Sequence, residues 1–155
     1  MRSSSELDSS RRLPKEFLLD ADVLYSYLSD DVHADHAEPL LLAIQEGRVR
    51  GYASSVLLVD LILAYRSIGV SIDALISAMK ELELLPLEYI PLTPSIARYA
   101  LSVYREHGGP RRLHFFDSFH VATAKSMDLP LITTDRYILS YQRKLGITAI
   151  DLDEI

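Results

Sequence analysis

Residues 114–135, HFFDSFHVATAKSMDLPLITTD, decide the fold of this chain. Apolar residues recur at helical spacing from about Asp117 to Met127, and the run LPLITT that follows is typical of a short buried strand. Asp117 stands where this helix is expected to start, and Asp135 stands where the strand ends. Because Asp is a favoured residue at helix N-termini, each aspartate is a candidate helix cap as well as a candidate part of an acidic site.

Helices and strands alternate along the rest of the chain as well. The patterns predict further strands at residues 16–20, 49–53, 87–92 and 147–152, and further helices at 21–29, 33–47, 55–67, 71–84, 93–105 and 138–146. Short strands that are apolar along most of their length, separated by helices, indicate an α/β fold with a parallel sheet. Ligands of such sheets bind beyond the carboxyl ends of the strands, which is where Asp20 and Asp135 fall.

Length and composition exclude several classes of protein. The 155 residues fit one domain, with a polar, Ser/Arg-rich tail expected at 1–15 and the folded domain at 16–155. Zero Cys excludes a disulfide framework and a cysteine zinc site, and a net charge of −6 argues against general coating of nucleic acid. No apolar run approaches the roughly 20 residues of a membrane helix, and the N-terminus has no secretory signal. We therefore expect a cytoplasmic protein without a membrane partner.

Asp60 is the aspartate that helix capping does not explain. It lies in the middle of the apolar helical pattern SVLLVDLILAY, and no Lys or Arg stands three or four residues away to pair with it in the helix. A carboxylate in such surroundings is costly unless it is paired or bound to a cation. If Asp60 converges with Asp20, Asp117 and Asp135, the four charges repel one another. A hard divalent cation such as Mg²⁺ or Mn²⁺, which prefers oxygen ligands, relieves that repulsion.

Four segments together resemble a known family. FLLDADVL, SSVLLVDLILAY, FFDSFHVATAKSMDLPLITTD and ITAIDL resemble the PIN-domain ribonucleases, and most closely the VapC-type toxins of prokaryotic toxin–antitoxin pairs. The resemblance covers about residues 16–153. It implies one three-layer α/β/α sandwich around a mostly parallel five-stranded sheet. It also implies an Mg²⁺- or Mn²⁺-dependent endoribonuclease that hydrolyses single-stranded RNA, a homodimer, and an antitoxin protein as partner.

The resemblance assigns roles to individual residues. Asp20, Asp60, Asp117 and Asp135 match the four acidic positions that hold metal and catalyse hydrolysis, although Asp60 stands where Glu is usual. Asp22 follows the first of these, and Thr133 or Thr134 matches the hydroxyl residue beside the last. Further substrate contacts are expected from a basic loop and from the helix after it, at Arg111, Arg112, His114 and His120. Solvated loop charges and a core or supporting histidine are the alternatives for these four residues.

Two other classes of protein remain open at this point. LLDAD followed by an apolar helix also resembles the nucleophile motif of haloacid-dehalogenase-type phosphatases, but Val23 and Leu24 stand where that family needs Gly-Thr or similar residues. The second alternative is a PIN-type fold that has lost most catalysis and acts as a binding module. The shorter side chain of Asp60 favours this alternative, whereas Asp20, Asp117 and Asp135 argue for an enzyme.

Overall fold

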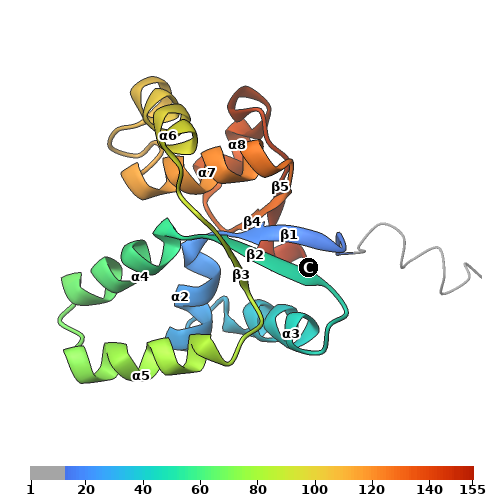
Figure 1. The fold of residues 1–155 in the computed structure, drawn as a ribbon, viewed down its shortest axis with the longest axis vertical. Helices are drawn as coiled ribbons and strands as arrows, with labels where there is room; N and C mark the ends of the chain where they lie inside the picture. The colour runs from blue at the N-terminus through green and yellow to red at the C-terminus, as the bar shows by residue number, and fades with distance from the viewer. Residues whose placement is uncertain (1–12) are drawn as a thin grey trace, which may run out of the picture.

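The computed structural model describes residues 13–155, which fold into three layers (Figure 1). The middle layer is a sheet of five strands in the order β3-β2-β1-β4-β5, and every pair of neighbours is parallel. The strands are β1 (Glu16–Leu19), β2 (Arg50–Ser54), β3 (Glu88–Ile90), β4 (Leu131–Thr133) and β5 (Ala149–Asp151). The predicted α/β sandwich is confirmed, and its sheet is parallel throughout rather than mostly parallel.

Helices cover both faces of the sheet. In Figure 1, α2, α3, α4 and α5 lie below the sheet, and α6, α7 and α8 lie above it. Their bounds are α2 (Ala21–Ser29), α3 (Ala34–Gln45), α4 (Val56–Ser67), α5 (Ile72–Glu83), α6 (Pro94–His107), α7 (Phe115–Met127) and α8 (Arg136–Leu145), followed by a short 3₁₀ helix, η1 (Leu152–Glu154). None of the helices in residues 13–155 has the length and apolarity needed to cross a membrane.

The central strand β1 separates two hydrophobic cores. Phe17 and Leu19 pack into the core formed with α2, α3, α4 and α5, whereas Leu18 packs into the core formed with α6, α7 and α8. All three side chains are completely buried. This alternation follows from the strand geometry, in which successive side chains point to opposite faces, and it fixes the register of β1 between the two layers.

The register of β1 and β4 brings distant residues together at one edge. Leu18 pairs with Leu131 and Leu19 pairs with Ile132, so Asp20 and Thr133 lie side by side where the two strands end. The backbone N–H of Asp20 still donates to the carbonyl of Ile132, at 3.0 Å. The carboxyl ends of both strands therefore present their polar residues at the same edge of the sheet.

Several predicted boundaries differ from the structure, among them the start of α7, the end of β5 and the start of the folded domain. α7 begins at Phe115, with extended His114 as its N-cap residue, so Asp117 lies in the first turn and the capping alternative for it is wrong. The last strand ends at Asp151, whose side chain caps η1. Residues 1–12 of the predicted tail lie outside the described residues, but residues 13–15 belong to the domain: Leu13 packs against the core, and the carbonyl of Lys15 accepts from Arg50 N–H.

Candidate acidic active site

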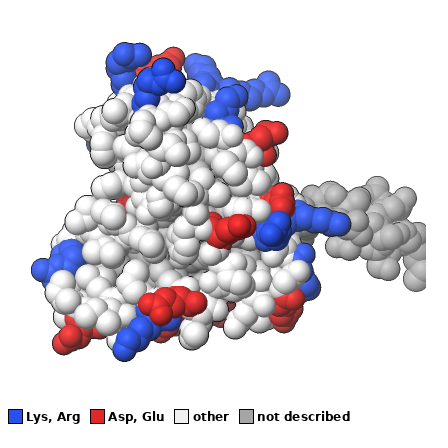
Figure 2. Space-filling view, in the orientation of Figure 1, with Lys and Arg blue, Asp and Glu red and all other residues white. Residues whose placement is uncertain are grey.

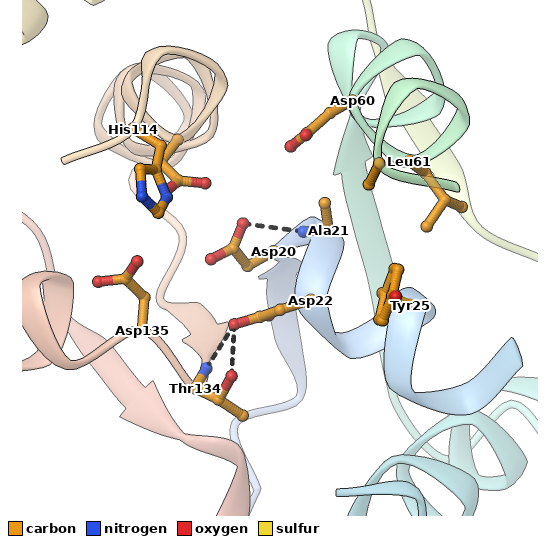
Figure 3. A pocket seen from close by; sticks show the side chains of 11 residues that line it. Asp20, Ala21, Asp22, Tyr25, Asp60, Leu61, His114, Thr134 and Asp135 are labelled. Atoms are coloured by element: carbon orange, nitrogen blue, oxygen red, sulfur yellow. Dashed lines mark hydrogen bonds and ion pairs between the residues drawn. The ribbon is translucent and has the colours of Figure 1, made fainter. Parts of the chain in front are cut away.

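An open cavity of about 320 Å³ lies beyond the carboxyl ends of β1 and β4. Its lining comes from α2, α4, α7 and the segment that joins β4 to α8: Asp20, Ala21, Asp22, Tyr25, Asp60, Leu61, Ala64, His114, Asp117, Thr134 and Asp135. Figure 3 shows the carboxylates of Asp20, Asp60 and Asp135 approaching the same space from different elements. The four predicted acidic residues thus line one cavity, although they come from segments far apart in the sequence.

Asp20 is fixed at the floor of the cavity by hydrogen bonds to both of its carboxylate oxygens. It is 2% exposed and forms the N-cap of α2, where Oδ1 accepts from the backbone N–H of Ala21 at 2.8 Å. Oδ2 accepts from the hydroxyl of Thr133 at 2.7 Å. The carboxylate is therefore held in one orientation before any ligand arrives.

Asp22, in the first turn of α2, is held by Thr133 and Thr134. Its Oδ2 accepts from the backbone N–H of Thr134 at 2.8 Å and from the Thr134 hydroxyl at 2.6 Å (Figure 3). It also accepts, at 3.2 Å, from the Thr133 hydroxyl that it shares with Asp20. Its other oxygen, Oδ1, is buried and has no hydrogen-bond partner among residues 13–155. A buried carboxylate oxygen without a partner is costly, so this atom needs a ligand from outside the chain.

Asp117 and Asp135 face each other across the opening of the cavity. Asp117 projects from the first turn of α7, with its Oδ2 3.3 Å from Nδ1 of the exposed His114. Asp135 is the N-cap of α8, where Oδ1 accepts from Ile138 N–H at 3.0 Å, and its own N–H donates to the Thr133 hydroxyl. The capping prediction for Asp135 is therefore confirmed, and the same carboxylate also lines the cavity.

Asp60 is paired with a buried histidine on the neighbouring helix. Its Oδ2 lies 2.8 Å from Nε2 of His120, which is completely buried in α7, and that Nε2 is 4.0 Å from Oδ1 of Asp20. Burial alone lowers the pKa of His120, but the hydrogen bond to Asp60 and the charges of Asp20 and Asp60 outweigh it and raise that pKa above 6.5. The pair links α4 to α7 and places the imidazole ring of His120 behind the acidic residues.

Burial and mutual repulsion raise the pKa values of three carboxyl groups at the site. Burial is the largest cause for Asp117, followed by the charges of Asp20, Asp135 and Asp60, and together they raise its pKa to about 9. Burial and the charge of Asp22 raise the pKa of Asp20 to about 7, and burial raises the pKa of Asp22 as well. Carboxyl groups that retain protons near neutral pH indicate a site in which negative charges are not neutralised by nearby positive ones.

The donor atoms fit a hard divalent cation. Oxygen and nitrogen ligand atoms of Asp20, Asp117 and His120 lie within 4.8 Å of one another, and so do those of His114, Asp117 and Asp135. Asp117 belongs to both groups and links them. A cation that binds the carboxylate oxygens of these groups offsets the repulsion that raises the pKa values, and carboxylate oxygens are the ligands that Mg²⁺ and Mn²⁺ prefer.

Two predicted substrate contacts, Thr133 and His120, need correction. Thr133 and His120 are completely buried, so neither has surface for a substrate; Thr133 orients Asp20 and Asp22, and His120 orients Asp60. Arg111 and Arg112 are exposed and lie outside the cavity lining. The guanidinium of Arg112 donates to the carbonyl of Glu106. Of the basic loop only His114 lines the cavity.

The sequence patterns missed two features of the site. The pairing of Asp60 with His120 joins residues 60 positions apart, and its only local signal was that His120 lies one helical turn after Asp117. The apolar side of the cavity, formed by Tyr25, Leu61 and Ala64, was also missed, because an apolar helical pattern does not distinguish side chains that line a cavity from those that pack in the core.

Comparisons with known proteins agree with this geometry. Residues 17–144 match the PIN domain family, whereas no curated protein matches the chain. VapBC2 from Rickettsia felis, solved with a DNA fragment from the promoter, is 15% identical, with a TM-score of 0.65 over 88% of this chain and 98% of that one. FitAcB from Neisseria gonorrhoeae is 19% identical, with a TM-score of 0.64 over 90% and 99%.

A third similar structure is VapBC-5 from Mycobacterium tuberculosis, a member of the VapBC family of toxin–antitoxin systems. It is 20% identical, with a TM-score of 0.57 over 89% of this chain and 99% of that one. At these identities the likeness concerns the fold. The family match, which spans most of the chain, overturns the haloacid-dehalogenase alternative. The chain belongs to the PIN domain family.

Proposed function

We propose that this protein is an endoribonuclease that depends on Mg²⁺ or Mn²⁺ and hydrolyses phosphodiester bonds of single-stranded RNA. The observation that carries the proposal is the convergence of Asp20, Asp60, Asp117 and Asp135 on one open cavity. The raised pKa values of Asp20 and Asp117 and the unpartnered oxygen of Asp22 favour a cation there. The nuclease chemistry of the PIN family supports the same reading.

The residues divide into those that hold the cation and those that orient the holders. Asp20, Asp117 and Asp135, with the free oxygen of Asp22, would hold it. A divalent cation bound there lowers the pKa of a water molecule and neutralises charge on a phosphate. Asp60, held by His120, has one oxygen left to accept a proton or to orient water at the edge of the cavity. His114, 76% exposed at the opening, is placed to donate to a phosphate oxygen.

The proposed biological role is that of a toxin held inactive by an antitoxin. Support comes from the fold shared with a toxin–antitoxin complex from Klebsiella pneumoniae and with VapBC-5, a member of a family of toxin–antitoxin systems. The apolar side of the cavity also offers contacts to a protein segment. We also propose a homodimer. Growth arrest on expression of this chain alone, and its sedimentation as a dimer at micromolar concentration, are the expected results. Normal growth contradicts the toxin role, and a monomer contradicts the dimer.

Cleavage of single-stranded RNA in the presence of Mn²⁺, Mg²⁺ or EDTA tests the nuclease proposal. The expected result is cleavage with metal and none with EDTA. Asp135→Asn keeps a good helix cap while removing one negative charge, so it should fold normally and lose at least a hundredfold in rate. Asp128→Asn is the matched control: Asp128 is exposed at the end of α7 with a positive φ that Asn tolerates, and its activity should equal that of the wild type. Cleavage in the presence of EDTA would refute the metal requirement. Equal cleavage rates for Asp135→Asn and wild type would show that Asp135 has no role in the reaction.

A further inference from the structure

The cationic side chains of this acidic protein are concentrated in one part of the chain. Residues 94–148 contain eight Lys or Arg and four Asp or Glu, and two of those four, Asp117 and Asp135, belong to the acidic site. Residues 13–93 contain five Lys or Arg and thirteen Asp or Glu. Figure 2 shows Lys and Arg gathered at the top of the view, over α6 and α8. This layer therefore carries the charge that attracts a polyanion.

A stack of two tyrosines, Tyr141 exposed and Tyr137 partly buried, lies on the same layer. The rings of Tyr137 and Tyr141, one turn apart on α8, have centroids 4.4 Å apart and planes 25° apart. The guanidinium of Arg112 lies 6.0 Å from the centre of the Tyr137 ring, and the ammonium of Lys144 lies 5.7 Å from the centre of the Tyr141 ring. We call these four side chains the tyrosine platform. It combines two flat rings with two cations, and 41% of Tyr141 is exposed.

The tyrosine platform is held in place from below. The hydroxyl of Tyr137 lies 2.9 Å from Nδ1 of His107, which is buried at the end of α6, and Arg112 Nη2 donates to the carbonyl of Glu106. α8 departs from helical geometry at Tyr141, with φ −109° and ψ 16°, at the residue whose ring stacks on Tyr137. The surface is thus ordered before any ligand binds, which lowers the entropic cost of binding.

Two chain segments lead from the acidic site to this platform. On α8, Asp135 lines the cavity and Tyr137 follows two residues later. On the loop between α6 and α7, His114 lines the cavity and Arg112 precedes it by two residues. Tyr141 lies six residues beyond Asp135, a rise of roughly 9 Å along a helix. That distance corresponds to about three nucleotides at the roughly 3.4 Å per nucleotide of a stacked strand.

We propose that the tyrosine platform binds nucleotides of the single-stranded substrate RNA that flank the cleaved phosphate; this inference rests on the proposed ribonuclease function. Unpaired bases stack on tyrosine rings, and Arg112 and Lys144 neutralise the phosphates between them. A duplex offers only the edges of its stacked bases, so it gains nothing from the rings. An acidic peptide matches the cations but has no flat faces for the tyrosines. The combination of rings and cations therefore favours single-stranded RNA over both.

Fluorescence anisotropy with a labelled single-stranded RNA of about 12 nucleotides, long enough to span the site and the platform, tests the proposal. Asp135→Asn protein serves as the background, so that binding is measured without cleavage. Adding Tyr141→Ala should weaken binding about tenfold, because base stacking is lost. Tyr141→Phe should bind like the background, because the ring is kept. Lys144→Ala should reduce the slope of log affinity against log salt by about 0.7, the contribution of one phosphate contact.

Tyr99→Ala is the matched control, because Tyr99 is 37% exposed on α6 in the same cationic layer but has no stacked partner among residues 13–155. It should leave affinity unchanged, and duplex RNA should be insensitive to Tyr141→Ala. If Tyr141→Ala binds the single strand as tightly as the background does, the platform is overturned. In otherwise wild-type protein, Tyr141→Ala should raise KM with kcat preserved. If the wild type does not cleave RNA but Tyr141→Ala still weakens RNA binding, the nuclease proposal is refuted and the tyrosine platform is supported.

Discussion

Asp117→Asn should stabilise the metal-free protein, in contrast to most substitutions of buried polar residues. The pKa of Asp117 is about 9 in the folded state, against an ordinary value of 3.8, and only 14% of its side chain is exposed. Between pH 3.8 and about pH 9, the carboxyl group of Asp117 keeps its proton in the folded state but has lost it in the unfolded state. The free energy of unfolding therefore falls as pH rises through this range, and it falls no further above pH 9.

The size of the effect follows from the same values. Each unit of pKa difference is worth roughly 1.4 kcal/mol, and pH 7 lies about three units above the ordinary pKa, so the cost at pH 7 is at most about 4 kcal/mol. Relaxation of the site and sharing of protons with Asp20 reduce this cost, and we expect a gain of about 1–2 kcal/mol for Asp117→Asn. Asn carries no charge at any pH, so its advantage should disappear near pH 4.

Urea unfolding followed by far-ultraviolet circular dichroism, in EDTA at pH 4, 7 and 9, measures this difference. Equal m-values for the two proteins would show that only stability has changed. Added Mn²⁺ should reverse the order, because the wild type binds the cation more tightly and gains more from it. Wild type and Asp117→Asn with the same dependence of stability on pH would refute the reasoning, since the carboxyl group would then carry no repulsion for Asn to remove.

Four further outcomes are expected from other parts of the structure. Asp60→Asn should cost about 1–3 kcal/mol of stability below pH 7, because buried His120 loses a charged partner. Because the pKa of His120 is raised in the folded state, the stabilisation from the Asp60–His120 pair is present in acid and is lost as pH rises through that pKa. Thermal melts of wild type and Asp60→Asn at pH 6 and 9 measure this loss. Asp60→Glu should retain RNA cleavage, whereas Asp60→Asn should lower it, and single-turnover rates separate the two. Thr133→Val should lower the free energy of unfolding by about 1–3 kcal/mol, because the carboxylates of Asp20 and Asp22 and the N–H of Asp135 each lose a hydrogen bond. Urea titrations measure the change, and Thr123→Val is the control because the Thr123 hydroxyl donates only within α7. Removing residues 1–12 while keeping Leu13 should leave the melting temperature and cleavage rate unchanged, and a loss of either would show that this segment contacts the domain.

The sequence was sufficient to predict features that depend on local patterns. The apolar runs before Asp20 and Asp135 predicted two strands, and parallel pairing then put both residues at one edge. Ser71 and Thr93 marked helix starts correctly, because their side chains accept from N–H groups three residues on. These signals lie within a few residues of the structure that they specify.

Features that depend on helix packing were beyond the sequence patterns. The hydrogen bond between Asp60 and His120 depends on how α4 crosses α7, and no periodicity within either helix encodes that crossing. The start of α7 was missed for a related reason. Phe115 packs against Tyr104 of α6 and Phe119 one turn later, so tertiary contacts extend the helix two residues before the expected start at Asp117.

The acidic site can form only after β1 has paired with β4. Asp20 and Thr133, which share a hydrogen bond, are 113 residues apart, and every helix of the lower layer and two of the upper one lie between them. A chain whose translation has passed Asp20 but has not reached Asp135 lacks part of the site. The ribosome that synthesises this protein is therefore not exposed to an assembled acidic centre until Asp135 has been made. By then residues 16–90 have already been made, so a partner that recognises the first three strands has an opportunity to bind before the site closes.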